Sequence, residues 1–329
     1  MKAIHSVGIA GTGHYVPERV ITNHDLEKMV DTSDEWIYTR TGMRARRIAA
    51  PEEACSDLCL KAAKSALEAA QMAPEELQMI IVGTVTGDYP LPNTACLVQT
   101  RLGAVNAGGF DIANGCSGFL TAFMTAYGLI ASGVVKNCLV IGAETLSRIL
   151  DYTDRGSCIL FGDGAGAMIL KADHPTGIIL DTFAGSDGSQ WEAIHIPGGG
   201  SRAPHTPESV AAKHHFMRLK GNEVFKFAVQ KFRDLIAESV NRIGYSVRDV
   251  SLVVPHQVNI RIIEAALKKL DIDMSRVYVN LDKYGNTSAA SVPIAFDEAL
   301  RDGRVAKGDL ISFVAFGAGL SWGSALVRW

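Results

Sequence analysis

The stretch DIANGCSGF, residues 111–119, places a cysteine where nucleophilic chemistry is feasible. An apolar strand is expected to end near Ala113, and a helix is expected to start near Ser117, whose side chain could cap it. The thiol of Cys116 would then face free backbone N–H groups and the positive end of the helix, which favour the thiolate. A small buried cysteine fits the same stretch, so other residues must distinguish the two interpretations.

Two further polar residues lie at element boundaries and could share a site with this cysteine. His256 follows the apolar run SLVVP, and α/β sheets commonly open their sites at strand ends. Asn286 lies in KYGNTSAAS, before small residues able to start a tightly packed helix. A lone histidine is more often structural, and an Asn after Gly is usually a turn residue. The turn after His256 is nevertheless crowded with polar side chains, at Gln257, Asn259 and Arg261.

Apolar runs alternate with helical patterns along the chain, which is typical of an α/β protein. The expected strands span residues 6–11, 79–85, 109–113, 138–144, 164–170, 251–256, 276–280, 310–317 and 324–329. Runs in the two halves resemble each other, MIIVGTV with SLVVPH and CLVIGAE…GAGAMIL with LISFVAFG…WGSALV. These echoes favour a duplicated β-α-β unit, although such short matches also arise by chance.

The sequence predicts an N-terminal half, residues 1–185, a connecting region, 186–215, and a C-terminal half, 216–329. The connection is expected because residues 186–210 are rich in Gly, Pro and Ser. Steps of three or four predict one apolar helix face from Phe225, Val229, Phe232, Ile236, Val240 and Ile243. The uncharged segment 112–135 contains polar residues and four glycines, so it is interpreted as a buried helix and not a membrane span.

Composition excludes several classes of function. The 329 residues are 47% hydrophobic and 20% charged, with a net charge of −3, so neither nucleic acid nor an anionic membrane is an expected partner. The N-terminus shows no signal-peptide pattern. Six cysteines without a CxxC pair indicate reduced thiols, a cytoplasmic protein and no metal site. The Gly-rich stretches GIAGTGHYVP and PGGGSR lack the residues of nucleotide-binding loops and are interpreted as turns.

Long motifs along the chain resemble those of the β-ketoacyl-acyl carrier protein synthase III family, the initiating condensing enzymes of bacterial fatty-acid synthesis. They are VDTSDEWIYTRTGMRARR, NGCSGF, DRGSCILFGDGAGA, GNEVFK, VPHQVNIRI, GNTSAASVP and FGAGLSWGSALVRW. The resemblance runs essentially end to end. It implies a thiolase-like fold, with two duplicated β-α-β halves in an α/β/α/β/α arrangement, and a homodimer.

The resemblance also implies a reaction. Cys116 would take the acyl group from a short acyl-CoA, with the backbone N–H groups of Cys116 and Ala318 holding the oxyanion. Malonyl-acyl carrier protein would then lose carbon dioxide, and His256 and Asn286 would donate hydrogen bonds to the enolate oxygen. The carbanion would attack the acyl-cysteine to give a 3-ketoacyl-acyl carrier protein. CoA is a substrate here, and no cofactor is expected.

The family's binding residues carry over to matching positions in this sequence. Trp36 and Arg155 would sandwich the CoA adenine, with Thr32 and Arg40 beside the nucleotide, and Asn222 and Asn259 facing the pantetheine arm. Without the resemblance, Trp36 would pass for a partly buried surface aromatic. The exposed face formed by Arg261, Lys268 and Lys269 would dock the acidic carrier protein, although it could equally be an ordinary solvated face. Leu91 would close the acyl pocket of the partner subunit, where acetyl-specific members commonly carry phenylalanine, or merely pack in its Pro-bounded turn.

Three alternatives remain open at this level. A Cys-His-Asn thioester hydrolase would use Asn286 to orient His256 and would release free acid. A non-catalytic acyl-binding scaffold would not need the three residues that are present here. A related condensing enzyme of secondary metabolism would carry the same residues, and the sequence does not separate it from one of primary fatty-acid synthesis.

Overall fold

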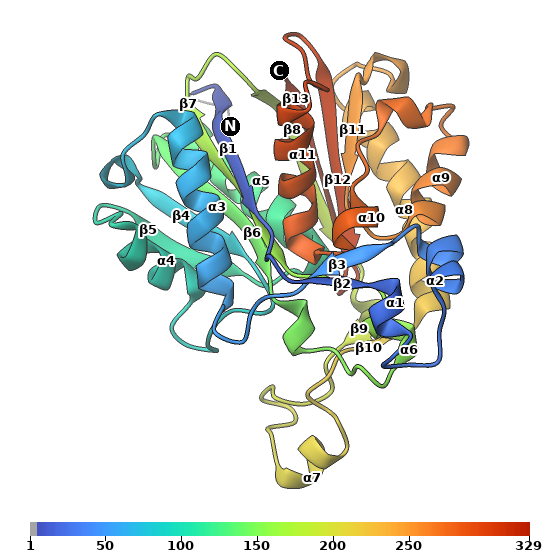
Figure 1. Ribbon diagram of the computed structural model, residues 1–329. Helices are drawn as coiled ribbons and strands as arrows, with labels where there is room; N and C mark the ends of the chain where they lie inside the picture. The colour runs from blue at the N-terminus through green and yellow to red at the C-terminus, as the bar shows by residue number, and fades with distance from the viewer. Residues whose placement is uncertain (1–4) are drawn as a thin grey trace.

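The computed structural model describes residues 5–329 and contains two main sheets (Figure 1). In the first sheet, β6 runs parallel to β4 and antiparallel to β7, and β7 pairs antiparallel with β1. The strand order is β1 (Val7–Tyr15), β7 (Gly164–Ala172), β6 (Asn137–Glu144), β4 (Met79–Gly83), β5 (Gly108–Ile112). Every residue of β6 is buried, as expected of a central strand covered on both faces.

The second sheet repeats the same pattern. β12 runs parallel to β11 and antiparallel to β13, which pairs antiparallel with β8. The strand order is β11 (Leu252–Pro255), β12 (Leu310–Gly317), β13 (Ser321–Arg328), β8 (Ile178–Ser186). In place of a counterpart of β5, the second sheet has a single parallel bridge between Val253 and Val277. The prediction of a full strand over residues 276–280 was therefore wrong.

The repeated topology supports the duplication suggested by the similar runs in the two halves. It also corrects the predicted boundary between the halves. β8 pairs in the second sheet, so by sheet membership the second half starts before residue 178, and the boundary predicted at residue 185 falls too late. The link between the halves contains Gly177, with φ of 63°. A Cβ there would lie 2.8 Å from Ile9 Cβ and 3.0 Å from Trp329 Cζ3, near the start of the described chain and its end.

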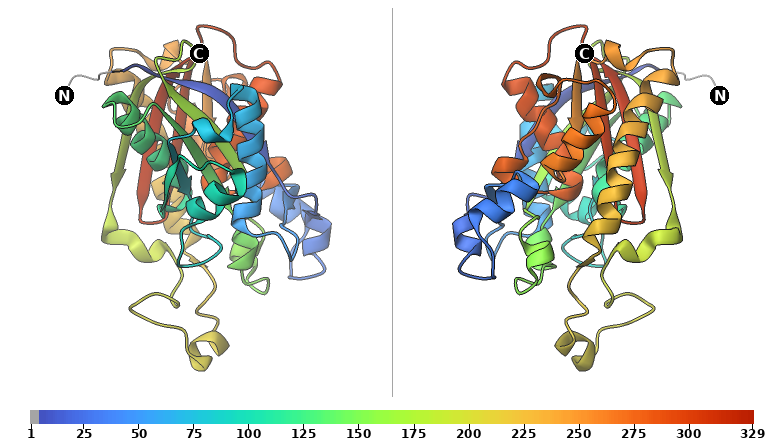
Figure 2. Two further views of the ribbon diagram at one scale, coloured as in Figure 1. Left: turned by 90° about the vertical axis from the view of Figure 1, so that its left-hand side faces the viewer. Right: turned by 90° about the vertical axis from the view of Figure 1, so that its right-hand side faces the viewer.

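Helices cover and separate the two sheets in five layers (Figures 1 and 2). The outer face of the first sheet packs on α3 (Cys55–Ala70) and α4 (Thr94–Leu102). The outer face of the second packs on α8 (Gly221–Asn241) and α9 (Ile260–Lys268). Between the sheets lie α5 (Gly118–Ala131) and α11 (Ser291–Arg301), which share one core with both inner faces. The α/β/α/β/α thiolase-like arrangement expected from the resemblance is therefore confirmed.

The expected helices are present, with corrections in detail. The helix expected from the apolar positions at 225–240 is α8, and Ile243 lies beyond its end. The uncharged segment 112–135 contains α5, as predicted. Ser117 precedes α5 but does not cap it, because its hydroxyl donates to the carbonyl of Asn114 at 2.9 Å and lies 2.7 Å from the Ser321 hydroxyl. Between residues 5 and 329, no helix has the length and apolarity needed to cross a bilayer.

Smaller elements complete the chain. Two short sheets are β2 (Val20–Thr22) with β3 (Ala45–Arg47), and β9 (Ile194–His195) with β10 (Arg218–Leu219). The short helices are α1 (Asn23–Leu26), α2 (Asp34–Thr41), α6 (Arg155–Cys158), α7 (Pro207–Ala211) and α10 (Leu281–Tyr284). The region predicted as a connection, residues 186–215, includes β9, which pairs with β10 beside the cavity, and α7, whose loop extends away from the body of the protein (Figures 1 and 2). Lys213 Nζ in this region forms an ion pair of 2.9 Å with the largely buried Asp151, which links the region to the rest of the protein.

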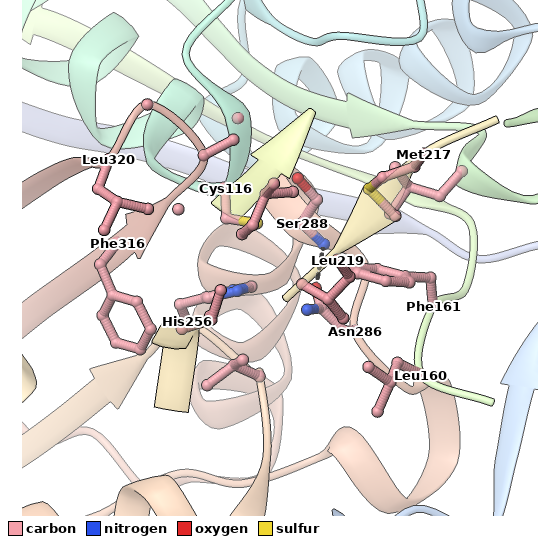
Figure 3. Close-up of a pocket in the computed structure, with 18 of the residues that line it drawn as sticks. Cys116, Leu160, Phe161, Met217, Leu219, His256, Asn286, Ser288, Phe316 and Leu320 are labelled. Atoms are coloured by element: carbon pink, nitrogen blue, oxygen red, sulfur yellow. Dashed lines mark hydrogen bonds between the residues drawn. The ribbon is translucent and has the colours of Figure 1, made fainter. Parts of the chain in front are cut away.

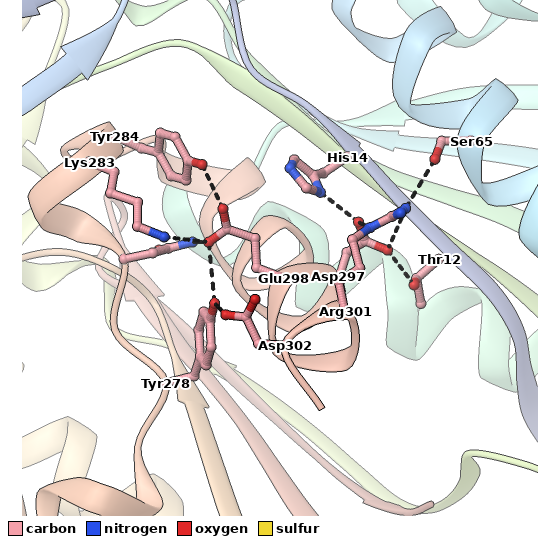
Figure 4. Close-up of polar contacts among 11 residues, drawn as sticks. Thr12, His14, Ser65, Tyr278, Lys283, Tyr284, Asp297, Glu298, Arg301 and Asp302 are labelled. Carbon is pink, nitrogen blue, oxygen red and sulfur yellow. Dashed lines mark hydrogen bonds and ion pairs between the residues drawn. The ribbon is translucent and has the colours of Figure 1, made fainter. Parts of the chain in front are cut away.

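Helix α11 is fixed in place by two polar clusters (Figure 4). The carboxylate of Asp297 accepts hydrogen bonds from Thr12 Oγ1 at 2.6 Å and Arg301 Nε at 2.7 Å, and it pairs with His14 of β1. The next residue, Glu298, accepts hydrogen bonds from Tyr284 of α10 and from other groups beside it. Because these carboxylates reach elements on opposite sides of α11, the helix is held in one orientation between the halves.

The halves approach each other closely because two central strands carry glycines where α11 and the turn before it are seated. A Cβ on Gly142 of β6 would overlap the carbonyl oxygen of Ala289 and lie 3.0 Å from Phe119 Cβ. A Cβ on Gly166 of β7 would lie 2.7 Å from the backbone nitrogen of Ile294. Backbone atoms cannot move aside as the end of a side chain can, so these positions require glycine.

We predict that Gly142→Ala lowers the free energy of unfolding by roughly 2–3 kcal/mol or more, because it overpacks backbone against backbone. Gly128→Ala in α5 is the matched control, since a Cβ there meets nothing within 4 Å. That control should gain roughly 0.5–1 kcal/mol from the higher helix propensity of alanine. Urea denaturation followed by circular dichroism measures both, and equal stability of the two variants would contradict the close approach described here.

Candidate active site

A cavity of about 520 Å³ opens between the two halves, and Cys116, His256 and Asn286 all line it (Figure 3). Its walls are otherwise largely apolar, with side chains from both halves such as Leu146, Phe161, Met217, Leu219, Phe225 and Phe316. The structure thus brings together the three residues that the sequence placed at separate element boundaries. A concave, mostly apolar cavity with a few convergent polar groups is the usual form of a small-molecule site.

Cys116 follows β5 in a 3-10 turn, η2 (Gly115–Ser117), that leads into α5. The turn is possible because Gly115 adopts a φ of 52°. Burial of the sulfur raises the pKa of the Cys116 thiol to about 12, a shift that the Ser288 hydroxyl opposes and the charge of Glu144 reinforces. Desolvation thus outweighs the helix end and the N–H groups, which were expected to favour the thiolate.

His256 comes directly after β11 and is buried, with 1% of its surface exposed. Its Nδ1 lies 2.7 Å from Ser291 Oγ, and that hydroxyl donates to the carbonyl of Ser288 at 2.8 Å. Because the Ser291 hydroxyl proton is already used, Nδ1–H is the donor to Ser291 and Nε2 carries no proton in this network. Desolvation lowers the pKa of His256 to about 3, so the ring is neutral at ordinary pH.

Asn286 is held by both its backbone and its side chain. Its N–H donates to the carbonyl of Leu160 at 2.8 Å, and its carbonyl accepts from the N–H of Gly162 at 3.0 Å. Its side-chain Oδ1 accepts the backbone N–H of Ser288 at 2.8 Å, which identifies Oδ1 and leaves the Nδ2 group as the hydrogen-bond donor (Figure 3). The residue does belong to a turn, as the Gly-Asn pair suggests, and this turn orients its amide.

The backbone that carries Cys116 and the backbone that carries Ala318 lie against each other. A Cβ on Gly115 would lie 3.1 Å from the backbone nitrogen of Ala318, and one on Gly317 would lie 2.6 Å from the nitrogen of Cys116. Neither the N–H of Cys116 nor that of Ala318 donates to a backbone carbonyl within residues 5–329. The two N–H groups expected to hold the oxyanion are therefore not committed to a backbone acceptor in the described chain.

Sequence reasoning missed three further polar residues around this cavity: Glu144, Ser288 and Ser291. Glu144 ends the buried strand β6 and has no exposed surface. A single carboxyl at the end of an otherwise apolar run, in CLVIGAE, was the signal available for it. Ser288 lines the cavity and adopts a φ of 50°, which is unusual for a residue with a side chain.

The residues expected to bind CoA gather in part. The guanidinium carbons of Arg40 and Arg155 lie 4.3 and 4.7 Å from the centre of the Trp36 ring, which α2 carries. Thr32 Oγ1 is buried without a hydrogen-bond partner among the described residues. Asn259 lines the cavity, but its side chain caps α9 through the N–H of Arg261 and donates to the carbonyl of Arg40. Asn222 is exposed at the start of α8, next to cavity-lining Gly221.

The remaining predicted positions lie on the surface. Arg261, Lys268 and Lys269 are all exposed along α9 and its C-terminal end, as predicted. Glu264 is exposed on the same helix, so this basic face also carries one acidic side chain. Leu91 is 86% exposed at the tip of its loop and does not line the cavity of its own chain.

Two equivalent sheets, a buried pair of helices and a thiol at the junction of the halves define a thiolase-fold condensing enzyme. The family profiles for 3-oxoacyl-[acyl-carrier-protein] synthase III match residues 110–188 and, for its C-terminal domain, residues 240–329. A β-ketoacyl-[acyl-carrier-protein] synthase III from Desulfitobacterium hafniense is 52% identical over 98% of both chains. The chain belongs to the β-ketoacyl-acyl carrier protein synthase III family.

Solved structures agree with this assignment. The synthase III of Aquifex aeolicus VF5 superposes with a TM-score of 0.91 at 47% identity, covering 98% of this chain and 100% of that one. The priming β-ketosynthase of the R1128 polyketide pathway gives a TM-score of 0.92 at 33% identity, covering 100% and 98%. This chain is thus an acyltransferase of the condensing type, and both relatives share its whole fold.

We predict that His256 stays neutral from pH 5 to pH 8. Desolvation disfavours the imidazolium, so the ring takes up a proton only as the pH falls toward about 3. NMR of protein labelled at histidine should show a His256 resonance that does not move over this range, with His256→Ala used to assign it. A shift with a midpoint near 6.5, the value of a solvated histidine, would contradict the prediction.

Proposed function

We propose that this chain joins a short acyl-CoA to malonyl-acyl carrier protein by decarboxylative Claisen condensation, through an acyl group carried on Cys116. The observation that carries the proposal is the convergence of Cys116, His256 and Asn286 on one apolar cavity. The family relationship supplies the reaction class, and the geometry supports a role for each residue. No cofactor or metal enters either half-reaction.

In the first half-reaction, Cys116 attacks the thioester carbonyl of the acyl-CoA, and CoA leaves. Negative charge develops on the carbonyl oxygen, where the free N–H groups of Cys116 and Ala318 can bind it. Arg40 and Arg155 beside Trp36 offer a cationic, aromatic surface suited to the nucleotide of CoA. We also propose that Thr32 lies beside the nucleotide of CoA, and that Asn222 and Asn259 face its pantetheine arm.

In the second half-reaction, the malonyl thioester loses carbon dioxide and its oxygen becomes an enolate. Asn286 is suited to stabilise it, because Ser288 fixes Oδ1 and leaves Nδ2 to donate. For His256 to donate as well, its Nε2 must carry the proton. Ser291 permits this change of tautomer. Its hydroxyl can rotate away from the carbonyl of Ser288 and donate to Nδ1 of His256 instead. A neutral histidine can then assist without a buried positive charge.

We also propose that the basic face of α9, made by Arg261, Lys268 and Lys269, docks the carrier protein. Carrier proteins of this class are acidic, and all three side chains are exposed. The face begins two residues after Asn259, which lines the cavity. A carrier bound there could deliver its malonyl group to the site. A cytoplasmic location is part of the same proposal, since acyl-CoA and malonyl-acyl carrier protein are both found inside the cell.

A related condensing enzyme of secondary metabolism is the nearest alternative, because the R1128 priming ketosynthase also shares the fold. The primer accepted and the carrier protein used distinguish the two roles. A thioester hydrolase would release free acid and form no ketoacyl thioester. Product analysis after incubation with acyl-CoA and malonyl-carrier therefore tests the proposed reaction directly.

Two substitutions separate the half-reactions. Cys116→Ala should abolish release of CoA from acyl-CoA but retain some malonyl decarboxylation, because His256 and Asn286 remain. Asn286→Asp should reduce decarboxylation by roughly 10²–10³-fold and acylation far less, since it places an acceptor where a donor is needed. Release of CoA and of labelled carbon dioxide are measured separately. Normal decarboxylation by Asn286→Asp would show that the role given to Asn286 is wrong.

We further propose that the protein works as a homodimer in which Leu91 reaches the acyl pocket of its partner. Leu91 is 86% exposed and Tyr89, in the same loop, is 61% exposed, so an apolar tip projects from the single chain. Exposed apolar groups of this kind are common at protein interfaces. A leucine would leave more room at the end of the pocket than a phenylalanine.

The homodimer proposal predicts the primer range. Acetyl-CoA, propionyl-CoA and butyryl-CoA should be used comparably well by the unmodified enzyme. Leu91→Phe should suppress butyryl-CoA by about 10-fold or more while sparing acetyl-CoA, as expected for a change of a few methylene volumes. Val134→Phe, at another exposed apolar position, is the control and should not alter the ratio. Strict acetyl preference in the unmodified enzyme would rule out this role for Leu91.

A further inference from the structure

A fully buried arginine has no role in the proposed reaction. Arg46, in β3, is 1% exposed, and desolvation lowers its pKa to about 10, so the side chain remains charged at neutral pH. Its Nη1 donates to Asn23 Oδ1 at 2.8 Å, and its Nη2 donates to the carbonyl of Ile159 at 2.5 Å. Both acceptors are neutral, and Nε has no hydrogen-bond partner among the described residues. Burying a guanidinium without a carboxylate costs free energy, so stability alone is a poor explanation for this arginine.

Asn23, the acceptor of Nη1, holds both ends of α2. Its Nδ2 donates to Oδ1 of Asp34, the first residue of the helix, and to the carbonyl of Met43, two residues past its end, both at 2.8 Å. An amide group can turn over and exchange its oxygen and nitrogen, but the bond from Arg46 to Oδ1 fixes which atom faces α2. Arg46 therefore determines the direction in which Asn23 donates.

The acceptor of Nη2 belongs to the other side of the expected nucleotide site. Ile159 directly follows α6, which begins with Arg155. Arg155 on α6 and Trp36 on α2 are the two residues expected to hold the CoA adenine, and the Arg155 guanidinium carbon lies 4.7 Å from the centre of the Trp36 ring. One buried guanidinium thus bridges the two helices that carry these residues.

The other contacts that join the segments around α2 and α6 are less restrictive. An apolar cluster that includes Ile37 and Cys158 lies beneath the helices, and apolar packing brings helices together without directional bonds. At the surface, Arg155 Nη1 donates to the carbonyl of Asp31 at 2.7 Å. Both of these residues are exposed, so water competes for the contact. The bonds made by Arg46 are directional and buried, so they fix the two helices more strictly.

The base of Arg46 is held beside the turn that carries Asn286. A Cβ on Gly162 would lie 3.1 Å from Arg46 Cβ, and one on Gly285 would lie 3.4 Å from it. Gly285 precedes Asn286 in the chain, and the N–H of Gly162 donates to the Asn286 carbonyl at 3.0 Å. Arg46 therefore fixes α2 and α6 relative to a turn that lines the catalytic cavity.

We propose that Arg46 is a positioning residue, which holds α2 and α6 so that Trp36 and Arg155 form one preformed surface for the nucleotide of CoA. The inference deepens the proposed function and rests on CoA being the acyl donor. Arg46 acts through Asn23 and Ile159 and does not touch the substrate. If the helices were not held in place, part of the binding energy of the nucleotide would be spent on ordering them.

Two acyl donors separate this role from a purely structural one. Acetyl-CoA carries the nucleotide, and acetyl-pantetheine carries the same thioester and arm without it. Arg46→Met keeps a long unbranched side chain and removes the guanidinium. It should lower kcat/KM for acylation by acetyl-CoA by about 10-fold, the size of one or two lost stacking contacts, and leave kcat/KM for acetyl-pantetheine unchanged. Equal losses with both donors, or no loss with either, would overturn the proposal.

A matched control and a binding measurement complete the test. Arg276→Met makes the same change at a partly buried arginine of the second half, whose Nη2 donates to the carbonyls of Val247 and Arg248 at 3.1 Å. It should leave the ratio between the two donors unchanged. Calorimetry with CoA alone, which needs no turnover, should show about 10-fold weaker binding by Arg46→Met. If the unmodified chain bound no CoA, the proposed function itself would fail, whereas equal binding by both proteins would overturn only the role of Arg46.

A second pair of variants decides if Arg46→Met does not fold. Asp34 is only partly buried, and Asp34→Ala removes the acceptor that α2 offers to Asn23. Asp34→Ala should reduce the preference for acetyl-CoA over acetyl-pantetheine. Asp34→Asn keeps an Oδ1 in the same place and should retain that preference. Full preference in Asp34→Ala, or equal loss in both variants, would show that this chain of hydrogen bonds does not position the nucleotide site.

Discussion

The close contact between the two halves is the constraint on which the site depends. Because Gly142 and Gly166 in the first sheet have no side chains, the turn before α11 and α11 itself pack directly against the strand backbone. Gly317 in the second sheet admits the backbone of Cys116 in the same way. Because of these contacts, Asn286 and Ser288 from one half lie over the cysteine from the other. A methyl group at any of the three glycines would push the halves apart and separate groups that must act together.

The cavity obtained in this way is almost free of fixed charge. No Asp, Glu, Lys or Arg side chain among the described residues lines it, and its polar side chains are those of Cys116, Ser288, two histidines (His195 and His256) and three asparagines (Asn114, Asn259 and Asn286). In a desolvated site, such dipoles stabilise a developing oxyanion or enolate without the cost of a buried cation. The same desolvation explains why both Cys116 and His256 rest in their neutral forms.

Much of this architecture could be predicted from the sequence, and the failures have physical causes. Strand and helix positions follow from apolar periodicity, so β4, β6, β11, β12 and α8 were found. The boundary between the halves was missed because β8 gives no local sign of which sheet it joins. Cys116, His256 and Asn286 each stand at an element boundary, where sequence patterns are informative. The orientation of Asn286 and the state of the thiol were not predictable, since they depend on Ser288, Ser291 and Glu144 meeting in space.

The link at Gly177 has a consequence for the order of the chain. Gly177 lies against Ile9 of β1 and against Trp329, so the junction between the halves meets the first strand of the first sheet and the last residue of the chain at one place. Each half has its own sheet, in which β8, β13, β12 and β11 follow the same order as β1, β7, β6 and β4, and the contacts between the halves do not depend on which half comes first in the chain. A circularly permuted chain that began at β8 and rejoined β1 after β13 through a short linker would keep every sheet pairing intact. The arrangement is what fusion of two copies of one ancestral gene would leave behind, with chemistry later divided between them.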